Sequence, residues 1–529
     1  MNSIFDLPQS VDELAPLNDG MTRVGYDQVS CTRENTKGFF AGGTQHYKFT
    51  TGSTKWWIPN RSYFRMRLAI ANGAADAQLT ADSDVAPNMN ICANLFQSAE
   101  LRLQGKTISR IDDFLPQVDS LETRLSKSKS WLDGQGASTG LWQTSVQERQ
   151  TVVDSDGIIN ETVSSSSRVV SSDPLNTVVG TAVGLFTFAA GGGTAIPDLT
   201  TLYNQGDEAV LVVGGTTITF KVKAVTATTL TSTSAQPVLA LGVITSLTRN
   251  RSTSVNSARG VRYIELIWTP PLSLMKYGGG LPTGEWEIVL TPHSSSSYPT
   301  YAVESLDAHR TSGTHFSIEV ESLLFYCAVV EGARFENGTY ALDLDETSCQ
   351  VNNITTTSFG QKDFTVSPST YALTIAYQDA RVGTDTRCSS SKFKSQNVGL
   401  TASTELQLQR MFVNFNSQNF PQPDADPNFD ATKDYTTQRY LESQIMSGCY
   451  FDTGGCESIQ EYHERGAYYH FKTPQDKGTR ATRVIVNQGF TGDNDDTKNM
   501  RVLLFSHHKS VLQVSIANGQ VRNVSVEPM

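Results

Sequence analysis

The stretch Lys55–Ile70 reads KWWIPNRSYFRMRLAI and decides the class of fold. After Pro59 the chain alternates with a period of two, which is typical of a half-buried β-strand. One side of that strand carries Phe64, Met66, Leu68 and Ile70, and the other carries Tyr63, Arg65 and Arg67. Proline cannot donate to a β-ladder. The stretch therefore predicts one strand that ends near the two tryptophans and a second that starts directly after a short turn.

The composition of the 529 residues extends this interpretation to the whole chain. Hydrophobic residues make up 38% and charged residues 18%, which leaves a large neutral polar share. Such a composition favours β-structure with long turns over helix bundles. The length predicts two to four domains.

The charge and the cysteines bear on partners and location. The net charge is −11, and residues 1–22 contain no Lys or Arg, so the acidic N-terminus is no basic arm for nucleic acid. The seven cysteines are scattered and form no CxxC pair, which indicates a reduced, intracellular assembly environment. The start of the chain has no signal-peptide pattern, and no run approaches 18 apolar residues.

Strand patterns recur in both halves, each with one helical segment. Apolar residues from Ile111 to Leu125 follow helical spacing, with the regular helix starting near Pro116, and a second short helix is expected at 437–447. Gly214-Gly215 and Asn518-Gly519 are hairpin signals. Residues 175–248 carry only five charged side chains and are predicted to form a compact β insertion. We place a domain boundary near residue 300, after the SSSS run at 294–297.

Residues that could support chemistry are few, and none forms a recognisable site. Ser138 lies in a GxSxG, but loop-like flanks replace the strand and helix that a nucleophile elbow needs. Asp343 and Asp345 are expected on the wet face of a strand, and His507-His508 in an exposed turn at a strand end. His463-Glu464 lacks the second histidine of a zinc helix, and 492–500 fails as a calcium loop. We expect no catalytic residue, no cofactor and no metal site, and hence no enzyme.

Four segments, taken in order, carry a family resemblance. They read HYKFTTGSTKWWIPNRSYFRMRLAI, NLFQSAELRLQGKTISRIDDFLPQVDSLETRL, PPLSLMKYGGGLPTGEWEIVLTP and GCYFDTGGCESIQEYHERGAYYHF. The series resembles major capsid proteins of the double jelly-roll lineage, as found in Polinton-like viruses and virophages, small DNA viruses of eukaryotes. The likeness spans most of the chain outside residues 175–248.

The resemblance implies an all-β fold of two tandem eight-stranded antiparallel jelly rolls with short helices. Its domains would be an N-terminal arm at 1–24, a first jelly roll at 25–300 and a second at 301–529. The insertion at about 175–248 would form a tower on the first. Three chains would form a pseudo-hexameric capsomer that tiles an icosahedral virion shell. Trp56 and Trp57 would then point to opposite faces, one to the sandwich core and one to a neighbouring domain or subunit.

The expected partners are other copies of the chain together with penton and minor capsid proteins, without sequence-specific nucleic-acid binding. The expected location is the virion, assembled inside the host cell. Two alternatives stay open at this point. One is a single jelly-roll capsid protein with a projecting β domain, and the other is a β-sandwich protein that adheres to or binds carbohydrate.

Overall fold

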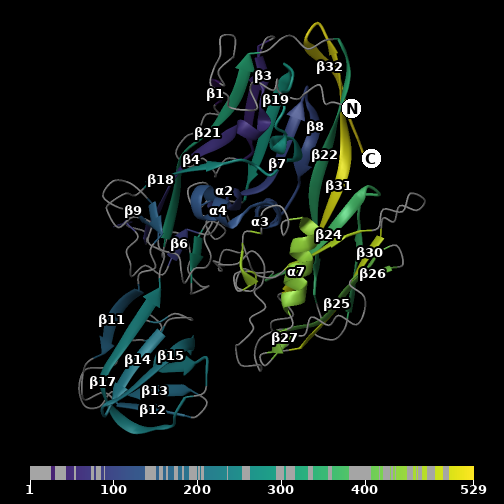
Figure 1. Cartoon of the computed structure of the whole chain (residues 1–529). Coiled ribbons are helices and arrows are strands. Elements are labelled where there is room, and N and C mark those ends of the chain that lie inside the picture. Colours follow the sequence, from purple (N-terminus) through teal and green to yellow (C-terminus); the bar gives the residue numbers. More distant parts are fainter. Residues whose placement is uncertain are drawn as a thin grey trace.

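A computed structural model of the chain describes its strands, its helices and the short connections between them (Figure 1). The described residues are 25–29, 43–52, 55–72, 77–78, 85–87, 90–136, 151–153, 159–161, 165–171, 177–181, 184–189, 199, 203, 208–234, 236–252, 263–293, 303–305, 316–331, 337–354, 360–379, 407–415, 418–420, 429–430, 433–434, 436–448, 455, 457–459, 462, 468–473, 483–491 and 500–528.

The first sandwich consists of two antiparallel sheets that face each other. One sheet has the order β1 (Gly25–Val29), β21 (Phe316–Glu331), β4 (Tyr63–Asn72), β18 (Tyr263–Trp268), with β3 (Lys55–Trp57) and β5 (Ala77–Gln78) at its margins. The other has the order β2 (Gln45–Thr50), β19 (Glu285–Pro292), β7 (Phe96–Leu103), β8 (Lys106–Ile111).

The second sandwich repeats this arrangement. One sheet has the order β22 (Gly338–Asn353), β31 (Met500–Ala517), β24 (Thr370–Asp379), β29 (Tyr468–Lys472), and β32 (Gln520–Pro528) pairs with β31. The other has the order β23 (Gly360–Thr365), β30 (Arg483–Thr491), β25 (Gln407–Phe415), β26 (Gln418–Phe420).

Both sandwiches share one strand order. When the main-path strands of each are numbered along the chain, the two sheets read 1-8-3-6 and 2-7-4-5 in both cases. This order is the jelly roll, in which the chain crosses repeatedly from one sheet to the other. A second sandwich follows the first, so the alternative of a single jelly roll with a projecting β domain is wrong.

The pairing of β21 moves the boundary that the sequence predicts between the halves. Residues 316–331 read as the first strand of the second half, but β21 pairs with β1, β3 and β4 of the first sandwich. The polar run at 294–297, which lies outside the described residues, therefore precedes the last strand of the first sandwich. An alternating pattern predicts a strand but does not choose its partner.

The insertion forms a sheet of its own between β8 and β18. Its strands are β11 (Ser165–Ser171), β12 (Thr177–Gly180), β13 (Leu185–Ala189), β14 (Glu208–Val213), β15 (Thr216–Val225), β16 (Thr229–Ser232) and β17 (Leu239–Ser252). The start of β17 pairs with β12 and its remainder with β14, which closes β12–β17 into a ring. We call this ring the barrel. A separate apolar cluster fills it, and it lies apart from the two sandwiches (Figure 1).

The stretch Lys55–Ile70 forms the expected strand, turn and strand, but the tryptophan expected to reach a neighbouring domain or subunit packs on residues of its own sandwich. Trp57 is fully buried in the first core, whereas Trp56 is partly buried and packs on the other side against Ile58, Ala328 and Val330. Pro59–Arg61 form one turn of 3-10 helix. The Ser62 hydroxyl that follows accepts bonds from the Trp57 indole N–H and the Ala328 amide, both at 2.9 Å.

The predicted helices and hairpins are present. The first helix, α3 (Leu115–Ser126), starts one residue before Pro116, and the second is α7 (Thr436–Ser447). Gly214-Gly215 joins β14 to β15, and Asn518-Gly519 joins β31 to β32 with φ of 57° and 74°. The remaining short elements are α2 (Ile91–Asn94), α4 (Lys129–Trp131), η3 (Leu132–Gly136), η5 (Ser273–Lys276), β6 (Val85–Pro87), β9 (Thr151–Val153), β10 (Ile159–Glu161), β20 (Val303–Ser305), β27 (Phe429–Asp430) and β28 (Lys433–Asp434).

Candidate functional site

The contact between the two sandwiches is the most elaborate polar region that the structure describes, and we call it the junction. From the first sandwich it includes β8, α3 and η5, and from the second β22, β24, β31, β32 and α7. Helices α3 and α7 occupy equivalent places, because each follows the fifth strand of its sandwich, and they touch each other. The same loop of each jelly roll therefore supplies the helix that meets the other half.

An ion pair at the centre of the junction joins residues 333 positions apart. The Arg124 Nε on α3 donates to both carboxylate oxygens of Glu457, at 3.0 and 3.1 Å. The two side chains are 1% and 0% exposed, and the guanidinium lies 4.6 Å from the centre of the Tyr468 ring. Tyr440 on α7 donates to the Glu457 carbonyl. Paired charges at this depth fix geometry, because any separation would leave a buried charge without its partner.

A row of polar side chains crosses the junction face of the second sandwich. Thr347, His507, Thr374 and His470 come from the four adjacent strands β22, β31, β24 and β29. The Thr374 hydroxyl lies 2.8 Å from His470 Nδ1 and 2.9 Å from His507 Nε2, and Thr347 lies 3.1 Å from His507 Nδ1. Because a hydroxyl carries one proton and two lone pairs, Thr374 can donate to only one of the two rings.

Burial keeps both histidines of this row neutral. It lowers the pKa of His470 to about 4, with a smaller contribution from nearby Lys472. Burial also holds the pKa of His507 well below its ordinary value, helped by His470, by Lys276 on η5 and by His508. The row is therefore a set of neutral hydrogen bonds at ordinary pH, and acid would place charge in a buried interface.

A second part of the junction joins β8 and the segment before β19 to β32. The Lys106 ammonium donates to the Val524 carbonyl at 2.8 Å, and the Val521 amide donates to the Thr283 carbonyl at 3.3 Å. A Cβ on Gly284 would lie 2.7 Å from Leu103 Cδ1 and 3.4 Å from Val521 Cγ2. Strand β32 of the second sandwich thus contacts β8 and residues 283–284 of the first.

The residues that the sequence offers as possible catalytic or metal-binding groups do not come together in one site among the described residues. Asp343 and Asp345 are exposed on β22, as expected. His507 and His508 point to opposite faces, but the expected exposed turn is wrong: β31 continues to Ala517, and His507 is buried while His508 lies 3.5 Å from Glu346. Ser138, His463-Glu464 and 492–499 lie outside the described residues. Among the residues that are described, no group of metal-ligating side chains gathers and no helix is long and apolar enough to cross a bilayer.

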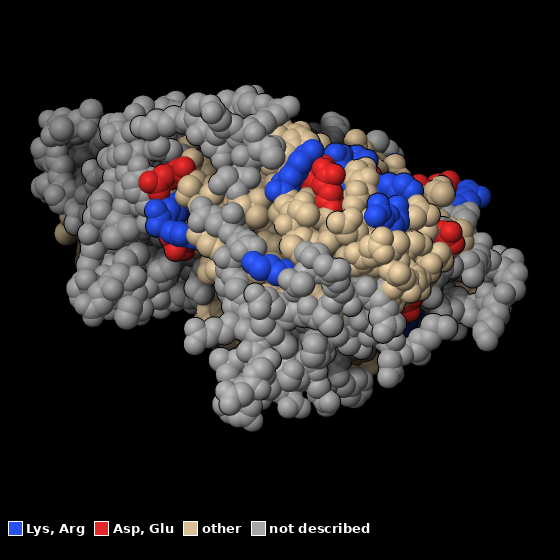
Figure 2. All heavy atoms as spheres, turned by 90° about the horizontal axis from the view of Figure 1, so that it is seen from above, with Lys and Arg blue, Asp and Glu red and all other residues tan. Residues whose placement is uncertain are grey.

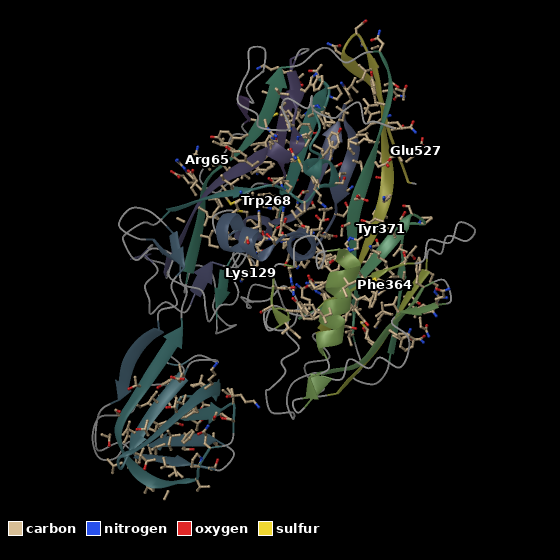
Figure 3. The ribbon with its side chains drawn as sticks, in the orientation of Figure 1. Arg65, Lys129, Trp268, Phe364, Tyr371 and Glu527 are labelled. Atoms are coloured by element: carbon tan, nitrogen blue, oxygen red, sulfur yellow. The ribbon has the colours of Figure 1, made fainter. Side chains whose placement is uncertain are left out.

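The outer face of the first sandwich is charged but balanced. Glu265 accepts from Arg65 and Arg67 at 2.7 Å each, and Tyr63 stacks on Tyr326. Arg65 lies at the outer edge of the sandwich, on the side away from Tyr371 and the junction (Figure 3). On the face seen from above, cationic and anionic side chains of the described residues are interspersed (Figure 2). This pattern differs from the continuous basic surface of a typical nucleic-acid binder.

Comparison with solved structures identifies the architecture. A protein chain of the Sputnik virophage matches with a TM-score of 0.50 and 10% identity, covering 97% of this chain and 90% of that one. The mavirus major capsid protein matches at 9% identity over 100% and 96%, and the Faustovirus major capsid protein at 8% over 95% and 92%, each with a TM-score of 0.44. No family model and no curated protein matches the sequence.

The chain has a double jelly-roll fold. The resemblance predicted from the four sequence segments is thereby confirmed for the fold, at a sequence identity of about a tenth. In this fold, the contacts of α3 with α7 and the Arg124–Glu457 pair join one jelly roll to the other.

Proposed function

We propose that this chain is a structural major capsid protein. Three copies would associate into a capsomer with a pseudo-hexagonal outline, and such capsomers would tile an icosahedral shell. One observation supports this above the others: a single chain carries two jelly rolls of the same strand order, held side by side by a buried polar junction. Three such chains present six similar units around a threefold axis, which is a closed cyclic arrangement.

The proposed domains follow the sheets. The first jelly roll would run from about residue 25 to residue 331, where β21 ends, and the second from β22 to the end of β32. Residues 1–24 would form an arm. The barrel, with a core of its own, would be a tower carried by the first jelly roll.

The net charge of the chain supports a role in the shell without direct contact to the genome. The chain is acidic overall, and capsid proteins that hold a genome directly need cations to neutralise phosphate. Genome contact would therefore belong to other proteins or to a membrane beneath the shell. Penton and minor capsid proteins would be the further partners, the location would be the virion, and the role would be structural and not enzymatic.

The mass of the purified chain in solution tests the proposal. A capsomer of three 57.8 kDa chains has a mass of about 173 kDa. Light scattering should give that mass at moderate salt, and negative-stain images should show tiles with a six-sided outline. A monomer at all concentrations, or tight salt-sensitive binding to duplex DNA, would contradict the proposal.

A further inference from the structure

The outer surface of the barrel divides into two unlike sides. Strands β14 and β15 carry charged residues: Glu208 stands opposite Lys221 in the register, and Lys223 follows on β15. The second half of β17, which pairs with β14, adds Arg249 and Arg251. The outward positions of β12, β13, β16 and of 238–245, which is the first half of β17 with the residue before it, carry no charge. We call these four segments the neutral side.

Exposed aliphatic side chains concentrate on the neutral side. Val238 and Leu241 are each 72% exposed, Val243 is 50% exposed and Val179 is 39% exposed. The register sets Val243 beside Thr177 and Val179 beside Thr187, so these residues form one surface across three strands. Four of the eight large hydrophobic residues that are exposed in the described part of the chain lie here.

The barrel does not need these side chains for its own stability. Its interior is filled by inward residues of the same strands, among them Val178, Phe186 and Ile244, all fully buried. The exposed aliphatic residues are therefore extra to the core. Exposed aliphatic side chains that gather on one side of a protein indicate a contact with another molecule.

We infer that the neutral side of the barrel packs against the equivalent side of neighbouring copies of this chain within the capsomer. This inference rests on the proposed function, which brings three barrels to the same height around one axis. Copies that each carry a net charge of −11 repel, and they approach at lowest cost where neither surface presents a charge to desolvate. A basic or acidic partner would need charged groups for recognition, and this side offers none.

The association of the jelly rolls strengthens such a contact. Once three chains are joined elsewhere, the barrels meet at a high effective concentration, so a small apolar surface is sufficient. The proposed contact thus stabilises the top of the capsomer without being the sole source of its assembly.

The test uses the full chain with Leu241→Asp and Val243→Asp together. The matched control is Thr217→Asp with Thr219→Asp, two exposed positions on the charged side of the same barrel. Sedimentation across a concentration series should show that trimer formation weakens by about tenfold or more in the first variant and stays close to wild type in the control. Far-UV circular dichroism checks that both variants fold.

A crosslinking measurement covers the case in which the double variant does not fold. Val243→Cys treated with a short bis-maleimide should yield covalently linked copies, whereas Thr217→Cys and the wild type should not. Suppose that the wild type sediments as a trimer. If the double aspartate variant then forms trimers as readily as the wild type, and Val243→Cys gives no crosslink, the barrel contact is wrong while the capsomer proposal stands. If the wild type sediments at 57.8 kDa, the capsomer proposal itself fails.

Discussion

Replacing Arg124 by methionine probes the junction most directly. Methionine retains much of the aliphatic stem, so the main change is the loss of the guanidinium from a site where it is 1% exposed. Glu457, at 0% exposed, would then lose that partner in a site without water contact. Removing one member of a buried ion pair costs about 3–5 kcal/mol, and loss of the stacking on Tyr468 adds to this. We expect Arg124→Met to lower the free energy of unfolding by that amount.

Two probes can follow the two jelly rolls separately. All six tryptophans lie at or before Trp286, so tryptophan fluorescence reports the first jelly roll, whereas far-UV circular dichroism reports both. In urea, the two signals of the wild type should change together because the junction couples the halves. In Arg124→Met they should separate, since each jelly roll retains its own sheets but loses part of its hold on the other.

Arg483→Met is the matched control. Arg483 pairs with Asp363 at 3.1 Å, but the two side chains are 69% and 59% exposed, so this pair is worth about 0–1 kcal/mol. The double variant Arg124→Met with Glu457→Met should recover most of the lost stability, because no charge stays buried. Arg124→Met that unfolds like Arg483→Met, with coincident probes, would refute the role assigned to the ion pair.

Further predictions concern acid, the tryptophans and one turn. Because the pKa of His470 is lowered from 6.5 to about 4, the unfolded chain binds more protons between these values, so stability should fall as pH falls through that window. His470→Gln should weaken this dependence, measured as urea midpoints at several pH values. Trp57→Ala should cost about 3–5 kcal/mol, and the partly exposed Trp56→Ala markedly less; equal melting temperatures would contradict the packing described. Gly519→Ala should cost about 1 kcal/mol because its φ is +74°. Gly338→Ala should melt nearly as wild type, because its φ is not positive and a Cβ there would lie at an ordinary contact distance of 3.7 Å from the Tyr340 hydroxyl.

Local features of the fold were accessible from the sequence because they depend on neighbours in the chain. The alternation after Pro59, the helix near Pro116 and the turn at Asn518-Gly519 each follow from a few adjacent residues. The low charge of 175–248 also predicted a separate β unit. Its closure into a barrel was not predictable, because it requires β17 to pair with β12 and β14 in turn.

The junction was largely inaccessible from the sequence. Arg124 reads as an ordinary polar residue on a helix, and nothing in its neighbourhood points to Glu457. From the sequence, His507 is predicted in an exposed turn, because the polar SHHK segment has no apolar alternation that would indicate a strand. The residues that bond its side chains are not visible from the segment itself. Thr347 and Thr374 supply the hydrogen bonds to His507 from two other strands, and His470 bonds Thr374 from a third. A buried polar residue is recognisable only together with the groups that satisfy it.

The polar character of the junction follows from what a tile must do. Two jelly rolls joined by an apolar face alone could slide, since hydrophobic contact is non-directional. The Arg124–Glu457 pair joins α3 of the first jelly roll to the second and is directional, so it helps to set the position of the second jelly roll against the first. In the proposed capsomer that position is repeated three times, and a small error in it would be repeated around the ring. We therefore expect junction variants to assemble into tiles of altered outline before they lose the fold of either jelly roll.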